Sequence, residues 1–321
     1  MAAAGADTDA ACSLDPQQLW QRVDEVYERA QQTGAALKTD TRTELLRDPS
    51  PPGLEFVLRV TTALKAKPKG PQQQPAPQQQ PGQPPRPQPA APKAWVNPFL
   101  PYEEALWVGH LSPTHTLLLN KFNVVAKHVL VVTRQFESQA DPLNANDLGA
   151  TMKVLLAMPQ GGVAFYNCGE HSGRSQPHKH LQVVPLPFDE RQPPAPPLQA
   201  AVGAAAAAAG AAPLEPLELR CLPFRAYAGL LPEGVTADQL AALSGRLLAA
   251  CQAGLPPPVS YNMLLWRGAM AMVPRSRECA GPCAINSLGF AGTMLLRSAE
   301  DLAYTKDTGP LAMLASVGVP W

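Results

Sequence analysis

Apolar residues recur at helical spacing in two stretches of the chain. Asp15 followed by Pro16 is typical of a helix start. The apolar positions that follow are three or four residues apart: Leu19, Val23, Val26, Tyr27 and Ala30. A second helix is expected after Thr236, which can form a capping box with Gln239, and Gly254 marks its end. Its apolar positions are Leu240, Leu243, Leu247 and Leu248.

Short runs of β-branched and aromatic residues predict strands elsewhere. These runs are 56–60, 129–133, 163–167 and 179–184. A later hairpin is expected from 261–265 and 271–273. Because the helices and strands alternate in no regular order, the pattern predicts an α+β fold with a largely antiparallel sheet.

Much of the chain's total of 37 prolines lies in two tracts of low complexity. Residues 68–94 consist almost wholly of proline, glutamine, glycine and alanine, whereas residues 189–216 combine prolines with an alanine run. The alanine run of the second tract could form a transient helix, but neither tract has the apolar stripe with which a helix packs onto a core. We therefore expect a disordered insertion and a disordered linker. The ordered parts are then an N-terminal region made of 13–67 and 95–188, and a C-terminal region, 217–321.

Composition narrows the possible functions. With 45% hydrophobic and 16% charged residues over 321 positions, the chain should be globular. Its 26 basic and 26 acidic residues cancel, so small molecules rather than nucleic acid or membranes are the expected partners. No apolar run reaches the roughly 18 to 20 residues that a bilayer requires. Six scattered cysteines without a C-x-x-C pair, and a start without a signal core, favour a reducing, cytoplasmic location.

The strongest candidate site is the segment 167–184, where a polar, glycine-containing loop becomes a strand. Alternate strand residues share a face, so His178, His180 and Gln182 should line one side, roughly 6 to 7 Å apart, with Lys179 on the other. A neutral imidazole can attack phosphorus without a base to activate it. Amides and hydroxyls of the preceding loop suit a phosphate chain, and they come from Gly169, Ser172, Gly173 and Ser175.

Two other interpretations of the histidines are open. Both histidines could be half-buried strand residues that are hydrogen-bonded for stability. Alternatively, two histidines separated by one residue are a common zinc pair, with Cys168 or His171 available as a third ligand.

The string S-G-x-S-Q-P-H-K-H-x-Q, residues 172–182, closely resembles the diadenosine tetraphosphate phosphorylases, or ATP adenylyltransferases. These enzymes are a branch of the histidine-triad superfamily in which glutamine replaces the third histidine. Arg174 departs from the family pattern, where a small residue is usual. The resemblance extends over nearly everything except the two tracts, through blocks at 115–123, 128–139, 142–148, 261–265, 273–275 and 286–292.

The resemblance implies a histidine-triad-like antiparallel sheet with flanking helices in the N-terminal region, and an ATP adenylyltransferase region at the C-terminus. It also implies that His180 is the nucleophile, that His178 orients it and that Gln182 holds the α-phosphate oxygens. His180 would take AMP from diadenosine tetraphosphate and release ATP, and inorganic phosphate would then take up the AMP to give ADP. The expected substrate-binding residues are Asn120, Lys121, Asn167, Gly169, Ser172, Gly173, Ser175 and Gln176.

Several points stay open at the level of sequence. No metal ligand and no tightly bound cofactor is expected, although Mg²⁺ can accompany the nucleotide. The acceptor could be another anion, such as sulfate with ADP, or the chain could be a catalytically idle nucleotide- or zinc-binding module. The sequence also leaves open whether the C-terminal region shares the core of the N-terminal region or closes its site.

Overall fold

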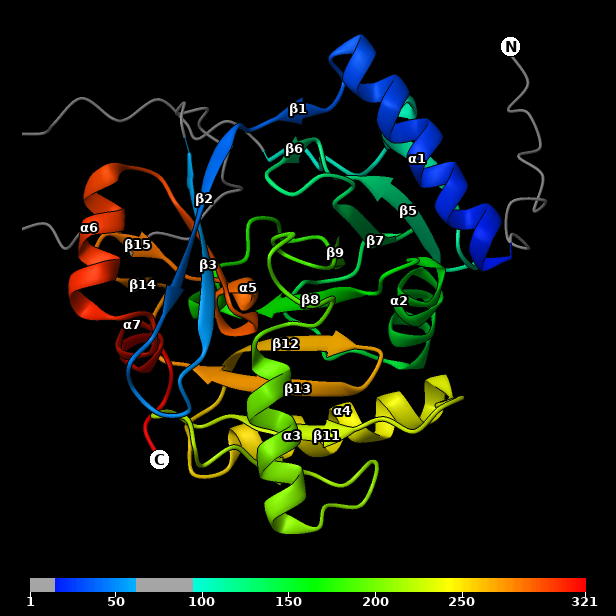
Figure 1. Cartoon of the computed structure of the whole chain (residues 1–321). Coiled ribbons are helices and arrows are strands. Elements are labelled where there is room, and N and C mark those ends of the chain that lie inside the picture. The colour runs from blue at the N-terminus through cyan, green and yellow to red at the C-terminus, as the bar shows by residue number, and fades with distance from the viewer. Residues whose placement is uncertain (1–14, 62–94) are drawn as a thin grey trace, which may run out of the picture.

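An antiparallel sheet of nine strands runs through the centre of the molecule (Figure 1). The computed structural model describes residues 15–61 and 95–321. The strands are β4 Trp107–His110, β5 His115–Leu119, β7 Val129–Thr133, β8 Gly162–Cys168, β9 His180–Pro185, β10 Leu217–Glu218, β11 Tyr227–Leu230, β12 Ser260–Trp266 and β13 Ala269–Arg275. Their order across the sheet is β10-β11-β13-β12-β8-β9-β7-β5-β4, and every neighbouring pair is antiparallel.

The C-terminal region completes this sheet. Strand β12 pairs with β8 over five residues, from Tyr261 opposite Cys168 to Leu265 opposite Ala164. Strands β10 to β13 therefore extend the sheet that the N-terminal region begins, so the two regions share one core.

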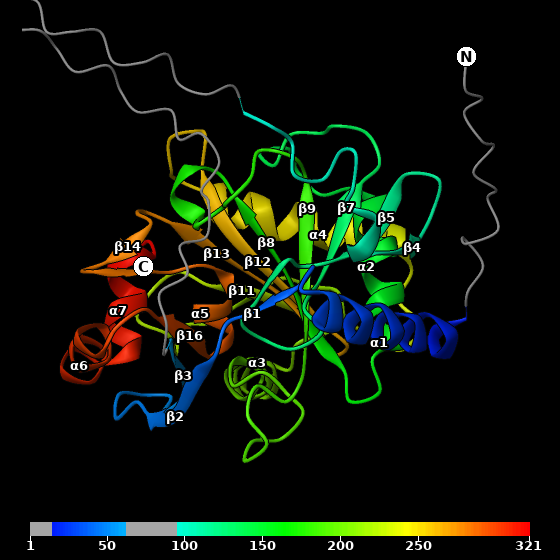
Figure 2. The same ribbon diagram turned by 90° about the horizontal axis from the view of Figure 1, so that it is seen from above.

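Helices cover both faces of the sheet. They are α1 Pro16–Thr33, α2 Ala145–Ala157, α3 Leu198–Ala209, α4 Ala237–Gln252, α5 Ser287–Ala291, α6 Ala299–Thr308, α7 Pro310–Val317 and the single turns η2 Glu104–Leu106 and η3 Glu170–Ser172. Apolar side chains of α1, α2 and α4 are buried with one face, and those of α3, α5 and α7 with the other. Figure 2 accordingly shows α3 and α4 on opposite sides of the strands.

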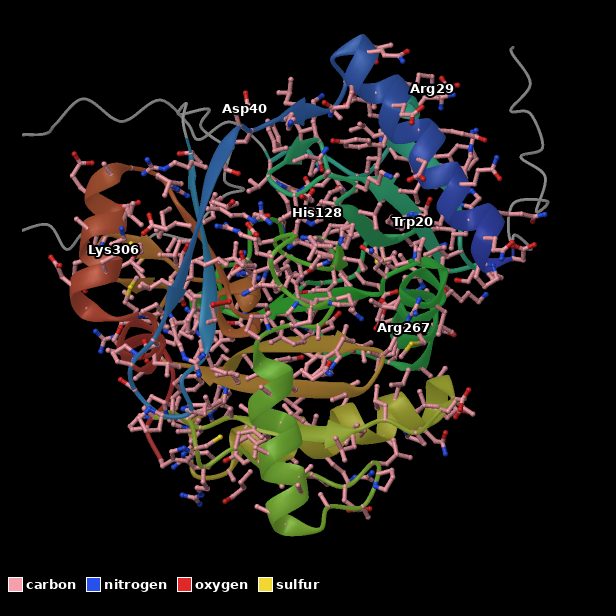
Figure 3. All side chains as sticks on the ribbon, viewed as in Figure 1. Trp20, Arg29, Asp40, His128, Arg267 and Lys306 are labelled. Atoms are coloured by element: carbon pink, nitrogen blue, oxygen red, sulfur yellow. The ribbon has the colours of Figure 1, made fainter. Side chains whose placement is uncertain are left out.

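The β12–β13 turn also ties the C-terminal region to α2. Arg267, labelled in Figure 3, lies in this turn and donates to the carbonyl of Leu155 from Nε at 3.2 Å and from one terminal nitrogen at 3.1 Å. The same terminal nitrogen donates to the carbonyls of Leu156 and Met158. These carbonyls lie at the end of α2, where backbone acceptors lack partners within the helix, so the arginine supplies them.

Smaller strands pack around the sheet. They are β1 Leu37–Lys38, β2 Thr41–Arg47, β3 Glu55–Thr61, β6 Phe122–Asn123, β14 Cys279–Ala280, β15 Cys283–Ala284 and β16 Thr293–Leu296. Strand β3 pairs with β2 in a hairpin and with β16 in parallel. Segments from the two ends of the chain therefore lie side by side.

The predicted α+β class with a largely antiparallel sheet is confirmed. Helix α1 begins where Asp15 and Pro16 predicted a helix start, and the Asp15 carboxylate caps it by accepting from the Gln18 N–H at 2.9 Å. Helix α4 begins at Thr236 with the predicted capping box. The four predicted strands correspond to β3, β7, β8 and β9, and the predicted hairpin to β12 and β13.

Disorder throughout the second tract, 189–216, was a wrong expectation, because Leu198–Ala209 forms α3. Four of its side chains are buried against the core: Leu198, Ala201, Val202 and Ala206. Alanine has the highest helix propensity, and its small side chain lets a helix lie close to a neighbouring surface, so a weakly apolar stripe is sufficient here. The first tract, 68–94, lies outside the described residues.

No helix within 15–61 and 95–321 is long and apolar enough to cross a membrane. The cysteines in these ranges are all unpaired thiols, namely Cys168, Cys221, Cys251, Cys279 and Cys283.

Candidate active site

Strand β9 presents its alternate side chains to different environments, as predicted. Leu181 and Val183 belong to the core that β9 shares with α1, α2 and α4. His180 and Gln182 lie on the opposite face and line a pocket there, although His180 is only 3% exposed. The strand therefore turns one face to the core and the other to the pocket.

The hydrogen bonds of His180 define its tautomer. Its Nδ1 lies 2.7 Å from the main-chain oxygen of His178. A carbonyl oxygen can only accept, so Nδ1 carries a proton, and the neutral form of this ring therefore has its lone pair at Nε2. This is the tautomer that a nucleophilic histidine requires.

His178 is fully buried beside the site. Its Nε2 lies 3.0 Å from the Thr133 oxygen and 3.1 Å from the Gln135 oxygen, so Nε2 donates. Its Nδ1 accepts from Asn97 Nδ2 at 3.0 Å. Burial lowers the pKa of His178 and outweighs the opposing effect of the carbonyl hydrogen bonds, which keeps the ring neutral. The link from His178 to His180 runs through the main-chain oxygen, not through the imidazole.

Within the described residues, the zinc interpretation of His178 and His180 finds no third ligand. Across the described ranges, no group of three or more His, Cys, Asp and Glu side chains is arranged to hold a metal ion. Burial raises the pKa of Cys168 to about 11, so this candidate ligand is a thiol at neutral pH rather than the thiolate that zinc binds. Both nitrogens of His178 contact protein groups instead.

The first pocket, of about 260 Å³, is mostly apolar. Its polar lining comes from His180, Gln182, Ser175, Gln176, Asn120, Lys121 and Glu103. Its apolar lining comes from Trp95, Val96, Pro98, Phe99, Leu106, Leu118, Leu119, Phe122 and Leu130. Aromatic and aliphatic walls with a few polar groups suit a flat heterocycle attached to a sugar.

Asn120 and Lys121 are both held at this pocket by other side chains. Asn120 Nδ2 lies 2.9 Å from Nδ1 of the buried His128, which is labelled in Figure 3. Lys121 Nζ forms a half-exposed ion pair with Glu103 at 2.7 Å. The structure therefore places both predicted residues in the pocket and adds His128 as the partner of Asn120.

A second pocket, of about 180 Å³, adjoins the first. Ser175 and Gln182 line both pockets, so the two meet beside His180. The lining of the second pocket comes from both regions of the chain and includes Asn167, Gly173, Asn286 and two arginines, Arg174 and Arg297. One carboxylate residue, Glu278, shares this lining. A pocket with two guanidinium groups suits a phosphate chain.

The glycines and Ser172 of the loop before β9 shape its backbone. Gly169 has a φ of 87°, and a Cβ there would lie 2.8 Å from the Ser260 Cα. Gly173 has a φ of 78°, and a Cβ there would lie 2.8 Å from the Ile285 oxygen. Ser172 is buried and donates to the Gly169 oxygen at 2.7 Å. Neither Gly169 nor Ser172 lines the first or the second pocket.

A chain of buried polar groups joins Asn167 to the C-terminal region. Asn167 Oδ1 accepts from Asn262 Nδ2 at 2.8 Å and from the Ser287 hydroxyl at 2.7 Å. Asn262 Oδ1 accepts in turn from the Arg275 guanidinium. Burial lowers the pKa of Arg275 to about 10, so it is still a cation at neutral pH. These hydrogen bonds join the loop before β9 to the C-terminal segments that carry Asn262 and Ser287.

Lys179 lies behind the site in a buried network of charges. Its Nζ is 2.9 Å from Glu137 Oε2 and 3.2 Å from Asp147 Oδ2, and Asp147 Oδ1 is 3.0 Å from His115 Nε2. Burial disfavours the charged form of Lys179, but the contacts with Glu137 and Asp147 outweigh it and raise the pKa of Lys179. Burial likewise disfavours the charged form of Asp147. The contacts of Asp147 with His115, Asn144 and Lys179 outweigh this effect and lower its pKa. Lys179 therefore lies on the side away from His180, as the strand alternation predicts.

Sequence reasoning missed the segment that follows the first tract. Trp95 Nε1 donates to Gln176 Oε1 at 3.2 Å, and the ring of Phe99 lies 5.1 Å from that of His180. Asn97 contacts His178, as described above. The sequence signal for this segment is that aromatic residues, Trp95 and Phe99, directly follow a tract without aromatic residues. This change in composition marks the return to a folded region but does not indicate a binding site.

Comparisons with known proteins agree with this architecture. The family model for the Ap4A phosphorylase N-terminal domain matches residues 9–203, and that for the ATP adenylyltransferase C-terminal domain matches residues 220–320. A Saccharomyces cerevisiae relative, diadenosine 5',5'''-P1,P4-tetraphosphate phosphorylase 2, is 34% identical over 217 residues, which are 59% of this chain and 64% of the relative. Protein APA1 of the same yeast is 30% identical over 215 residues, 60% of this chain and 64% of APA1. The matched part thus spans less than two thirds of either relative.

Solved structures extend the likeness over nearly the whole fold. Yeast Ap4A phosphorylase Apa2 in complex with Ap4A has a TM-score of 0.76 and 26% identity, covering 96% of this chain and 99% of that one. The complex of Apa2 with AMP has a TM-score of 0.74 and 28% identity, covering 94% and 97%. Since the N-terminal family model alone matches more than half of the 321 residues, the chain belongs to the Ap4A phosphorylase family.

Proposed function

We propose that this protein is a nucleotidyltransferase that cleaves diadenosine tetraphosphate with inorganic phosphate to give ATP and ADP. The observation that carries the proposal is the tautomer of His180, whose Nδ1–H donates to the His178 oxygen while the ring lines the pocket beside Ser175 and Gln182. The proposal is further supported by the family relationship and by the relative solved with Ap4A.

The two pockets divide the substrate between them. One adenosine would occupy the first pocket, with Asn120 at the ribose. The remaining polyphosphate, and later the incoming phosphate, would lie in the second pocket near Arg174 and Arg297. Ser175 and Gln182, which line both pockets, would contact the α-phosphate at the junction.

The reaction takes place in two displacements at the α-phosphorus. The Nε2 lone pair of His180 forms an N–P bond while the P–O bond to the leaving group breaks, and ATP departs as a stable anion. The ring becomes positively charged, and the His178 oxygen stabilises that charge through Nδ1–H. An oxygen of inorganic phosphate then attacks phosphorus, the N–P bond breaks, and ADP forms with neutral His180 restored.

We expect no tightly bound cofactor to take part in these steps. Mg²⁺ would enter with the nucleotide and neutralise its phosphate charge. Activity measured in EDTA, with and without added Mg²⁺, tests this part of the proposal.

Product analysis with diadenosine tetraphosphate, with and without phosphate, tests the function. With phosphate we expect equal amounts of ATP and ADP over many turnovers. Without phosphate we expect at most about one ATP per protein molecule, because the reaction stops at the adenylyl enzyme. Release of AMP in place of ADP, or binding without turnover, would refute phosphorolysis. Turnover with sulfate or another acceptor but not with phosphate would refute the assigned acceptor.

Replacing Ser175 with alanine should weaken catalysis. Ser175 lines both pockets at their junction, and a lost hydrogen bond to a charged group costs about 1.5 to 3 kcal/mol. This corresponds to a decrease of roughly 10- to 150-fold in kcat/KM. Steady-state kinetics check the effect, and a decrease confined to KM would mean that the contact is equally strong in the ground state. Unchanged kcat and KM would exclude Ser175 from the site.

A further inference from the structure

Gln139 is a buried residue between β7 and α2 whose side chain reaches the catalytic strand. It is 1% exposed. Its Oε1 accepts from the His180 N–H at 2.7 Å, and its Nε2 donates to the His180 oxygen at 3.2 Å and to the Asn167 oxygen at 3.1 Å. One carboxamide thus satisfies both main-chain groups of His180.

The carboxamide takes the place of a missing strand pair. Strands β8 and β9 pair from Gly162 opposite Pro185 to Phe165 opposite Gln182. The same register would place Tyr166 opposite Leu181 and then Asn167 opposite His180, but the paired residues end at Phe165 and Gln182. The Gln139 carboxamide lies in this gap. Its Nε2 donates to the main-chain oxygens of Asn167 and His180, and its Oε1 accepts from the His180 N–H.

Main-chain hydrogen bonds hold Gln139 from both sides. Its N–H donates to the Pro177 oxygen at 2.8 Å, and its own oxygen accepts from the Tyr166 hydroxyl at 2.8 Å. The side chain therefore extends from an anchored backbone, and its position is transmitted to His180 and Asn167. His180 lines the first pocket and Asn167 lines the second.

We propose that Gln139 is a positioning residue for transfer of the adenylyl group. It keeps β8 and β9 apart at His180 and fixes the backbone that carries the imidazole, so that Nε2 is held in line with the phosphorus. The inference rests on the proposed function of His180. A displacement of about 1 Å in a reacting group can cost a factor of about 100 in rate, which sets the scale of the expected effect.

Gln139→Met tests the proposal with little change in side-chain volume. The variant should lower kcat by about 30- to 100-fold and leave KM for diadenosine tetraphosphate within about threefold, because the in-line position of Nε2 matters in the transition state and not for ground-state binding. Tyr166→Phe is the matched control. It removes the hydrogen bonds to the Gln139 and Asp141 oxygens, but the Gln139 N–H bond to Pro177 and the carboxamide stay in place, so kcat should decrease by less than about tenfold.

Hydrogen exchange of the His180 amide provides a readout independent of activity. Exchange should be at least about tenfold faster in Gln139→Met than in wild type or Tyr166→Phe, because only Gln139→Met removes its acceptor. Absence of turnover in the wild-type protein would refute the proposed function. The difference in His180 amide exchange between wild type and Gln139→Met would still show whether Gln139 holds the His180 backbone.

Two results would overturn the positioning role. One is wild-type kcat in Gln139→Met, and the other is an equal loss of kcat in Tyr166→Phe. If Gln139→Met does not fold, Gln139→Glu replaces it. This variant keeps the acceptor for the His180 N–H but directs a carboxylate oxygen at two carbonyls, so kcat should again decrease by at least about 30-fold with KM nearly unchanged.

Discussion

Replacing His180 with alanine should abolish turnover and covalent labelling together. Removal of a nucleophile typically lowers kcat by roughly 10⁴-fold or more, because the remaining contacts cannot substitute for bond formation. Wild-type protein incubated with substrate labelled in its adenylate should acquire a label that is acid-labile and base-stable, as a phosphoramidate is. Labelling is measured after denaturation, and turnover is measured as release of ATP.

His178→Ala is the matched control for this experiment. The His180 Nδ1–H donates to the main-chain oxygen of His178, and the substitution keeps this oxygen. We therefore expect reduced but measurable labelling and turnover. Two in-line displacements give net retention at the α-phosphorus, so net inversion with a chiral substrate would contradict the mechanism. Full turnover by His180→Ala would contradict it as well.

Replacing Lys179 with methionine should lower the free energy of unfolding by about 3 to 5 kcal/mol, the usual cost of breaking a buried ion pair. Asp147 is fully buried and would lose its lysine partner, leaving only its contacts with His115 and Asn144. Glu137 has a side chain that is 40% exposed and can turn toward water, so most of the cost comes from Asp147. Denaturation by urea, followed by circular dichroism, measures the loss.

Lys306→Met is the control for a surface ion pair. Lys306, labelled in Figure 3, pairs with Glu44 where both side chains are partly exposed to solvent. Such pairs contribute about 0 to 1 kcal/mol, so this variant should unfold at nearly the wild-type urea concentration. Equal effects of the two substitutions would show that the Lys179 network adds little to stability.

Local sequence signals were sufficient for much of the fold and for the centre of the site. The capping boxes at Asp15 and Thr236 use only residues within one helical turn. The alternation in β9 places His180 and Gln182 on one face because strand geometry alone determines it. Such features depend on sequence neighbours and are therefore readable without a tertiary structure.

Helix α3 shows where a local criterion was inadequate. An alanine-rich helix has only a weak apolar stripe. Whether such a helix is buried depends on whether another part of the fold offers a surface on which its small side chains can pack. That surface comes from strands and helices elsewhere in the chain. Composition alone could not predict it.

The tertiary structure also decided how the site is assembled. Pairing of β12 with β8 brings Asn262 and Ser287 to Asn167, and it places Arg297 in a pocket with Arg174. Which distant strands pair depends on the free energy of burying the whole sheet, and no single segment encodes that quantity. The sequence by itself therefore determined which side chains of β9 share the pocket face. Only long-range packing determined the second pocket and the hydrogen bonds of Gln139 to His180, because both join residues that are distant along the chain.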